Sequence, residues 1–189
     1  MHKYLPKLFI FIDQYNSYLF ENNNINTGII YRNYNSRKRE EDLYEIVKAC
    51  KKKRYKIFIS NDIKLAIKFK ADGIYIPSFN KIKQFGNLEN KNLIILGSAH
   101  NQKEIQEKIS QKCTGIFLAP LFKMKKYKQS LGLCRFNYLT YKNDVNFFAL
   151  GGINKNNIRR LKMLNIKGFA GIRMFKKKPA SKRPVFLKN

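Results

Sequence analysis

The stretch YKIFISNDIKLAIKFKADGIYI, residues 55–76, carries the pattern that decides the fold. A short apolar run ends at Ser60, apolar residues then recur at helical spacing between residues 62 and 69, and a second apolar run covers Gly73–Ile76. Continuous apolar runs are typical of strands that are buried on both faces, and the amphipathic segment between them is typical of a crossover helix. The stretch therefore predicts a βαβ unit with two parallel strands.

The same alternation of apolar runs and amphipathic segments continues over the whole chain. The runs that predict strands are Leu8–Ile12, Thr27–Tyr31, Tyr55–Ser60, Gly73–Ile76, Leu93–Leu96, Gly115–Leu118, Val145–Leu150 and Gly168–Ile172. Helical spacing is clearest in Arg39–Lys53, Asp62–Phe69, Gln102–Cys113 and Asn156–Leu164. Eight strands that alternate with helices are enough to close a parallel barrel.

The length of 189 residues is short for a barrel of this kind, which usually has about 250 residues. The links at 14–26 and 79–92 are predicted to contain little helix, and Pro179 and Pro184 argue against a regular helix in the basic tail. We therefore expect one α/β domain over residues 1–189. It would be a trimmed (β/α)8 barrel of the TIM type, with reduced helices and a basic C-terminal tail.

The cysteines and the apolar runs indicate where the protein acts. Cys50, Cys113 and Cys134 are widely spaced and form no metal or disulfide pattern, which favours a reducing, cytoplasmic compartment. The run at Leu8–Ile12 is too short for the core of a signal peptide, and we expect no membrane-spanning helix.

The formal net charge of +27 could indicate a polyanionic partner. Lysine is spread over the whole chain, however, with runs only at 51–53 and 176–178, and no nucleic-acid-binding motif accompanies it. We expect small anionic ligands, and a basic nucleic-acid-binding protein is the more distant alternative.

Polar residues and glycines follow most of the predicted strands, at the barrel end that carries active sites. Such residues are Arg32, Asn61, Asp62, Asn80, Ser98, His100, Gly151, Gly152 and Arg173. A carboxylate beside an arginine suits a magnesium-bound diphosphate, and glycine turns after the last two strands suit a phosphate.

Each of these residues also has a structural interpretation. Asp62 is well placed to begin a helix, and Gly151-Gly152 can form a tight turn. Arg32 can be a solvated residue at the rim, and His100 more often caps a helix or faces solvent than it catalyses.

Seven segments, taken together and in order, resemble the thiamine phosphate synthase family, which includes a thiazole tautomerase branch. They are residues 29–32, 58–62, 71–76, 96–100, 119–122, 150–153 and 168–172. The resemblance implies a transferase that joins an aminopyrimidine diphosphate to a thiazole phosphate and releases pyrophosphate.

The resemblance also implies roles for individual residues. Arg32 and Asn61 would hold the diphosphate, Asp62 would bind Mg²⁺, and Ser98 would contact the pyrimidine diphosphate. The Gly151-Gly152 turn would hold the thiazole phosphate together with the backbone of Ile172 and Arg173.

The chain departs from the family pattern at several of its functional positions. Tyr34 stands where the family has a lysine. Asn80 stands where the family has a second magnesium carboxylate, and its amide oxygen would be the second metal ligand beside Asp62. The family's lysine after the sixth strand is also replaced, so Lys125, Lys126 or Lys128 would have to supply that charge. The tautomerase histidine would fall near Pro120, which disfavours that activity. The alternative is a non-catalytic or repurposed relative that binds a phosphorylated ligand.

Overall fold

The structure, a computed structural model, describes residues 4–21, 26–34, 38–83, 92–125 and 129–171. Its strands are β1 (Leu8–Ile12), β2 (Thr27–Tyr31), β3 (Lys56–Ser60), β4 (Gly73–Ile76), β5 (Ile94–Ala99), β6 (Gly115–Leu118), β7 (Asn146–Leu150) and β8 (Gly168–Gly171). Each strand pairs in parallel with the next along the chain, and β8 pairs with β1 to close the barrel. The predicted (β/α)8 architecture is confirmed. The prediction of one domain over residues 1–189 includes residues outside the described ranges and stays a prediction.

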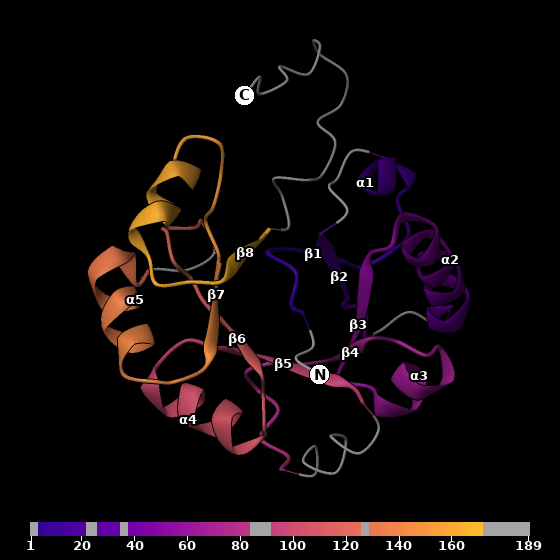
Figure 1. Ribbon diagram of the computed structural model, residues 1–189, viewed down its shortest axis with the longest axis horizontal. Coiled ribbons are helices and arrows are strands. Elements are labelled where there is room, and N and C mark those ends of the chain that lie inside the picture. The colour runs from indigo at the N-terminus through magenta and orange to yellow at the C-terminus, as the bar shows by residue number, and fades with distance from the viewer. Residues whose placement is uncertain (1–3, 22–25, 35–37, 84–91, 126–128, 172–189) are drawn as a thin grey trace.

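Helices surround the ring of strands, as Figure 1 shows along the barrel axis. They are α1 (Ser17–Glu21), α2 (Arg39–Lys53), α3 (Ile63–Lys68), α4 (Gln102–Ser110), α5 (Gly132–Tyr141) and the 3-10 helix η2 (Ile158–Met163). Fewer than eight helices therefore cover the barrel within the described residues, as expected for a trimmed barrel. The predicted tail lies outside the described residues.

Three helical segments differ from the sequence-based expectation. The segment expected to be a helix at residues 156–164 forms the 3-10 helix η2, and α1 lies in a link that was expected to contain little helix. Helix α5 was not predicted, because glycine, asparagine and threonine are weak helix formers. It forms because Phe136, Leu139 and Thr140 become buried against the barrel, and tertiary packing outweighs propensity.

Helix α2 is the longest helix of the described chain and brings Arg39 to the rim of the barrel. Its first turn holds Glu40, Glu41 and Asp42, and its last turn holds Lys51–Lys53, so the charges at both ends complement the helix dipole. The helix packs a buried stripe on the strands, formed by Leu43, Ile46, Val47 and Cys50.

The barrel interior is filled by side chains, most of them apolar and many aromatic. This inner cluster consists of Phe9, Phe11, Ile30, Phe58, Tyr75, Ile94, Leu96, Phe117, Phe148 and Ala170. The ring of Phe117 lies 5.0 Å from that of Phe9 and 5.6 Å from that of Phe11, both edge to face. The barrel is a packed core rather than a pore, so a ligand site has to lie above it, at the carboxyl ends of the strands.

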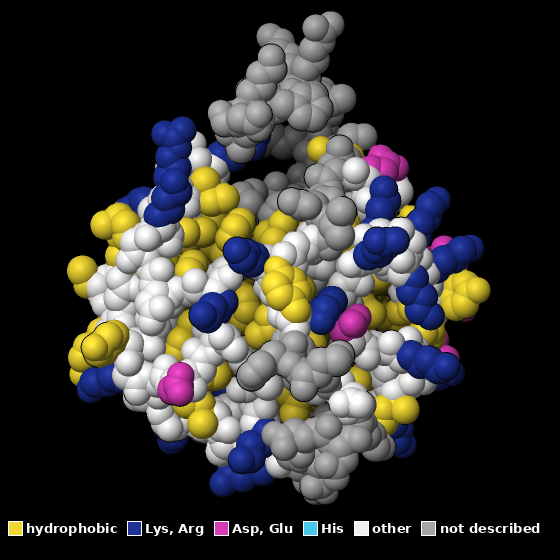
Figure 2. All heavy atoms as spheres, in the orientation of Figure 1, with side chains coloured by type: hydrophobic (Ala, Val, Ile, Leu, Met, Phe, Trp, Pro, Cys, Tyr) yellow, Lys and Arg dark blue, Asp and Glu magenta, His cyan; other side chains and the backbone are white. Residues whose placement is uncertain are grey.

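None of the helices in the described parts of the chain is long and apolar enough to cross a membrane. Cys50 and Cys113 are buried, Cys134 is exposed, and all three are free thiols. Lysine and arginine side chains are scattered over the face shown in Figure 2 and do not gather in one patch. This distribution matches the even spread of lysine along the sequence.

Candidate functional site

Arg32 and Ser98 lie at the top of the aromatic interior, where β2 and β5 end. The guanidinium carbon of Arg32 is 5.4 Å from the centre of the Phe11 ring. The side chain of Ser98 is buried beside that of Tyr75. Burial raises the pKa of Tyr75 to about 12, against the lowering effects of Ser98 and of the Arg32 charge. The two predicted site residues therefore lie near neighbouring rings of the interior, Phe11 and Tyr75.

Asn61 and Asn80, from the ends of β3 and β4, are joined by their side chains. Asn61 adopts a left-handed backbone conformation with φ of +57°, and its backbone N–H donates to the Tyr75 carbonyl over 2.9 Å. The side-chain amide of Asn80 donates to Asn61 Oδ1, and Asn80 Oδ1 accepts from the backbone N–H of Ile82 over 2.8 Å. The structure thus brings together two residues that the sequence placed 19 positions apart.

Asp62 begins helix α3 and also forms an ion pair. Its Oδ1 accepts from the backbone N–H of Leu65 over 2.9 Å, which caps the helix. Its Oδ2 accepts from Arg39 Nη1 over 2.9 Å, with both side chains largely buried. The structural interpretation of Asp62 as a helix cap is confirmed, and its role toward a metal stays a prediction.

The side chains at this rim do not fit a preformed magnesium site. Both oxygens of Asp62 already accept hydrogen bonds, and Asn80 Oδ1, its only ligating side-chain atom, accepts one from Ile82. The guanidinium of Arg39 already neutralises the single carboxylate and would repel a second cation. The described residues also contain no cluster of three or more histidine, cysteine or acidic side chains that could hold a metal.

Three further residues belong to this rim, and sequence reasoning did not select them as site residues. The Tyr34 hydroxyl lies 2.6 Å from Ser60 Oγ, and Ser60 is fully buried. Arg39 Nη2 donates to the backbone oxygen of Ser60 over 2.9 Å. Among these residues, only Tyr34 had a sequence signal, since it stands at a family lysine position. No local pattern predicts that Arg39 contacts Ser60, which lies 21 positions further along the chain.

The Gly151-Gly152 turn packs against the loop that follows β6. The backbone N–H of Phe122 donates to the Gly151 carbonyl over 3.1 Å. Gly152 has φ of +73°, and a Cβ atom there would lie 2.5 Å from the Phe122 backbone oxygen. The tight-turn interpretation therefore holds, while the phosphate-binding role stays a prediction.

The remaining predicted residues are only partly described. Lys125 is exposed on the loop after β6, and none of the contacts seen among the described residues joins it to the Arg32–Asp62 region. Lys126, Ile172 and Arg173 lie outside the described residues.

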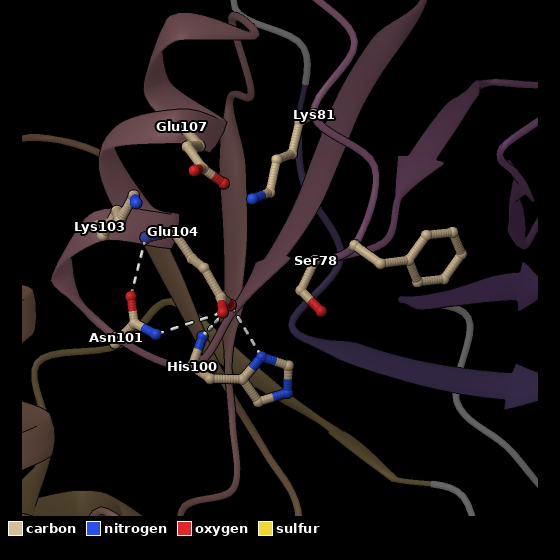
Figure 3. A pocket seen from close by; sticks show the side chains of 8 residues that line it. Ser78, Lys81, His100, Asn101, Lys103, Glu104 and Glu107 are labelled. Atoms are coloured by element: carbon tan, nitrogen blue, oxygen red, sulfur yellow. Dashed lines mark hydrogen bonds and ion pairs between the residues drawn. The ribbon is translucent and has the colours of Figure 1, made fainter.

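A hollow of about 410 Å³ lies between the loop after β4 and the start of α4. Figure 3 shows His100 and Asn101 turned toward Glu104 in this hollow. Glu104 Oε2 accepts from the His100 backbone N–H over 2.9 Å and lies 2.8 Å from its Nδ1, while Asn101 Oδ1 accepts from the Glu104 N–H. Asn101 is therefore the N-cap of α4, and His100, the residue before it, is bonded to Glu104 of the first turn in an arrangement like a capping box.

Comparisons with known proteins identify the family of this chain. The profile of the family described as thiamine monophosphate synthase matches residues 23–175. Thiamine-phosphate synthases from two strains of Prochlorococcus marinus are each 33% identical to this chain, over 131 and 135 residues. The matches cover 68% and 70% of this chain but only 38% of each relative, so the chain spans about two fifths of their length.

A solved structure has the same fold. It is a thiamine phosphate pyrophosphorylase from Pyrococcus furiosus, which superimposes with a TM-score of 0.73 at 22% sequence identity. The match covers 88% of this chain and 85% of that structure. Because the family profile matches most of the sequence and the fold agrees over nearly all of it, the chain belongs to the thiamine monophosphate synthase family.

Proposed function

We propose that this chain is a transferase that joins an aminopyrimidine diphosphate to a thiazole phosphate. The thiazole nitrogen forms a bond to the pyrimidine methylene carbon, the bond from that carbon to the diphosphate oxygen breaks, and its electron pair leaves with pyrophosphate. Family membership supports this proposal. The observation that carries it is the placement of Arg32, Asn61 and Ser98 at one end of the barrel, where β2, β3 and β5 end.

The side chains at this end suit a leaving group that gains negative charge. Arg32 lies over the Phe11 ring, above a floor of packed aromatic side chains. Fixed donors beside such an apolar floor stabilise developing charge more strongly than donors that are free in bulk water. Arg32 and the amide of Asn61 would hold the diphosphate, and Ser98 would contact the pyrimidine half.

The thiazole phosphate would bind at the ends of β7 and β8. Phosphates are commonly held there in β/α barrels, and the Gly151-Gly152 turn lies at the end of β7. The backbone of Ile172 and Arg173 would complete this site. We also propose that the protein acts in the cytoplasm, in keeping with its three free thiols.

A second candidate function is phosphate binding without catalysis. It is favoured by the ion pair that occupies Asp62 and by the neutral Asn80 and Tyr34 at charged family positions. This relative would bind the diphosphate and form no product. A nucleic-acid-binding protein, the third candidate, would instead show affinity that falls steeply with salt.

The test is product formation by the purified full chain with both substrates. We expect thiamine phosphate and pyrophosphate to appear in equal amounts. Arg32→Gln should lower turnover at least about tenfold, since charge-assisted hydrogen bonds are worth about 1.5–3 kcal/mol. Lys52→Gln removes the same charge from the exposed end of α2 and should leave turnover unchanged. Tight binding of both substrates without product would establish the non-catalytic candidate instead.

A further inference from the structure

Arg39 is held at the rim by three different partners. Nη1 donates to Asp62 Oδ2 and Nη2 donates to the Ser60 backbone oxygen, each over 2.9 Å. The guanidinium carbon lies 5.9 Å from the centre of the Tyr31 ring. Because a carboxylate, a carbonyl and an aromatic ring all surround it, the charged group has a defined position rather than that of a mobile surface arginine.

The guanidinium nevertheless has N–H groups that these contacts do not use. An arginine side chain has five N–H groups, and the two contacts above use two of them. Its Nε is buried and has no hydrogen-bond partner among the described residues. A buried donor without an acceptor costs free energy, so the hydrogen-bonding capacity of this guanidinium is not fully used by its present partners.

A second arginine, Arg32, follows the end of β2, the strand beside β3. The register of β2 and β3 pairs Tyr31 with Ile59, so the residues that follow, Arg32 and Ser60, lie side by side at the rim. Ser60 is the residue whose carbonyl holds Arg39. Two guanidinium groups are therefore associated with the ends of adjacent strands, and Asp62 is the only carboxylate bonded to either in the described structure.

We propose that Arg39 takes the place of a divalent cation at this rim, so that the chain binds a diphosphate group through Arg39 and Arg32 without a metal. Asp62 is then a positioning residue that orients the guanidinium. A guanidinium binds phosphate oxygens through two parallel N–H groups, which gives it geometric as well as electrostatic selectivity. The identification of the anion as a substrate diphosphate rests on the proposed function, whereas the anion site itself does not.

The test is calorimetric titration of the full chain with inorganic pyrophosphate, in excess EDTA and in millimolar magnesium. We expect wild-type affinity to be the same within about twofold in both buffers. Arg39→Gln should weaken it at least about tenfold, equivalent to about 1.4 kcal/mol, in both. Arg39→Lys, which keeps the charge and loses the paired donors, should bind with intermediate affinity. Lys52→Gln is the control, because it removes one charge from the other end of α2.

The possible results separate this inference from the proposed function. Pyrophosphate binding that requires magnesium in the wild-type chain would overturn the inference, and this comparison needs no variant to fold. Equal weakening by Arg39→Gln and Lys52→Gln would also overturn it, because binding would then reflect the general surface charge. Metal-independent binding that depends on Arg39 supports the inference even if no thiamine phosphate forms, a result that would overturn only the proposed transferase activity.

Discussion

Lys108 Nζ lies 2.7 Å from the backbone oxygen of Asn80, so a fully buried lysine of α4 fixes the loop that follows β4. Gln111, one turn further along, donates to the same oxygen over 3.0 Å and to the Ile82 carbonyl over 2.9 Å. Burial lowers the pKa of Lys108, and the charges of Cys113, Glu107 and Glu104 compensate this only in part. The position of Asn80 beside Asn61 therefore depends on a helix that follows it by more than 20 residues.

We expect Lys108→Met to destabilise the fold, because it removes the donor to Asn80 and leaves Gln111 Oε1 without its lysine partner. The free energy of unfolding should fall by about 1–3 kcal/mol, the usual cost of leaving buried polar groups unsatisfied. Urea unfolding provides the measurement. Lys103→Met, on the exposed face of the same helix, should have little effect, and equal losses in the two variants would contradict a structural role for Lys108.

We expect Asn80→Asp to create a magnesium site that the wild-type chain lacks. In the wild-type structure the Asn80 amide donates to Asn61 Oδ1, so aspartate would place two oxygens face to face, and a cation would relieve their repulsion. Calorimetric titration with magnesium in the absence of substrate should show saturable binding only in the variant. Asn156→Asp adds the same charge to an exposed loop and serves as the control. Matching titrations for Asn80→Asp and Asn156→Asp would show that the contact between residue 80 and Asn61 does not favour a cation.

Gly152→Ala should destabilise the protein more than Gly132→Ala. Both glycines have positive φ, at +73° and +66°, so alanine at either position meets similar backbone strain of about 1 kcal/mol. A Cβ at Gly152 would also lie 2.5 Å from the Phe122 backbone oxygen, whereas one at Gly132 has no atom within 4 Å. Thermal and urea unfolding of the pair would isolate the steric contribution. Equal stabilities would show that the Gly151-Gly152 turn is less tightly packed than described.

Alkaline pH should weaken the fold through Tyr75. In the unfolded chain its pKa is near 10, but burial raises the folded value to about 12, so protons are lost from the unfolded state first. Stability should be unaffected by Tyr75 below pH 10 and should fall by about 1.4 kcal/mol per pH unit from there to about pH 12. In Tyr75→Phe this loss is absent, so the stability difference between wild type and variant should shrink between pH 9 and pH 11. A difference that stays constant over that range would contradict the shifted pKa.

Much of the barrel could be predicted because strand signals are local. The predicted limits of β1, β2, β4 and β6 agree with the observed ones, since each is a continuous apolar run closed by turn residues. Strand β5 extends to Ala99, three residues beyond its predicted end, because Gly97 and Ser98 are held in register by β6. Side chains as small and polar as these give no strand signal until a neighbouring strand pairs with them.

The sequence predicted several residues of the candidate site, but it did not predict which residues they contact. Arg32, Asn61, Asp62 and Ser98 were selected because they follow or end predicted strands, and strand ends of a parallel barrel meet at one rim. Their partners Arg39, Ser60 and Tyr75 were not selected, since each reaches the site through a side chain whose direction depends on the packing of a helix or on the barrel interior.

The sequence by itself determined the parallel strands, the barrel and the family, because the pattern of apolar residues and the order of the motifs are both visible in the sequence. Only the tertiary structure decided what Asp62 does, since Arg39 precedes it by 23 residues and meets it only when α2 packs beside β3. Barrel closure brings the ends of separate strands together. The interactions between charges at that rim depend on the distances between them, and these distances cannot be read from positions in the sequence.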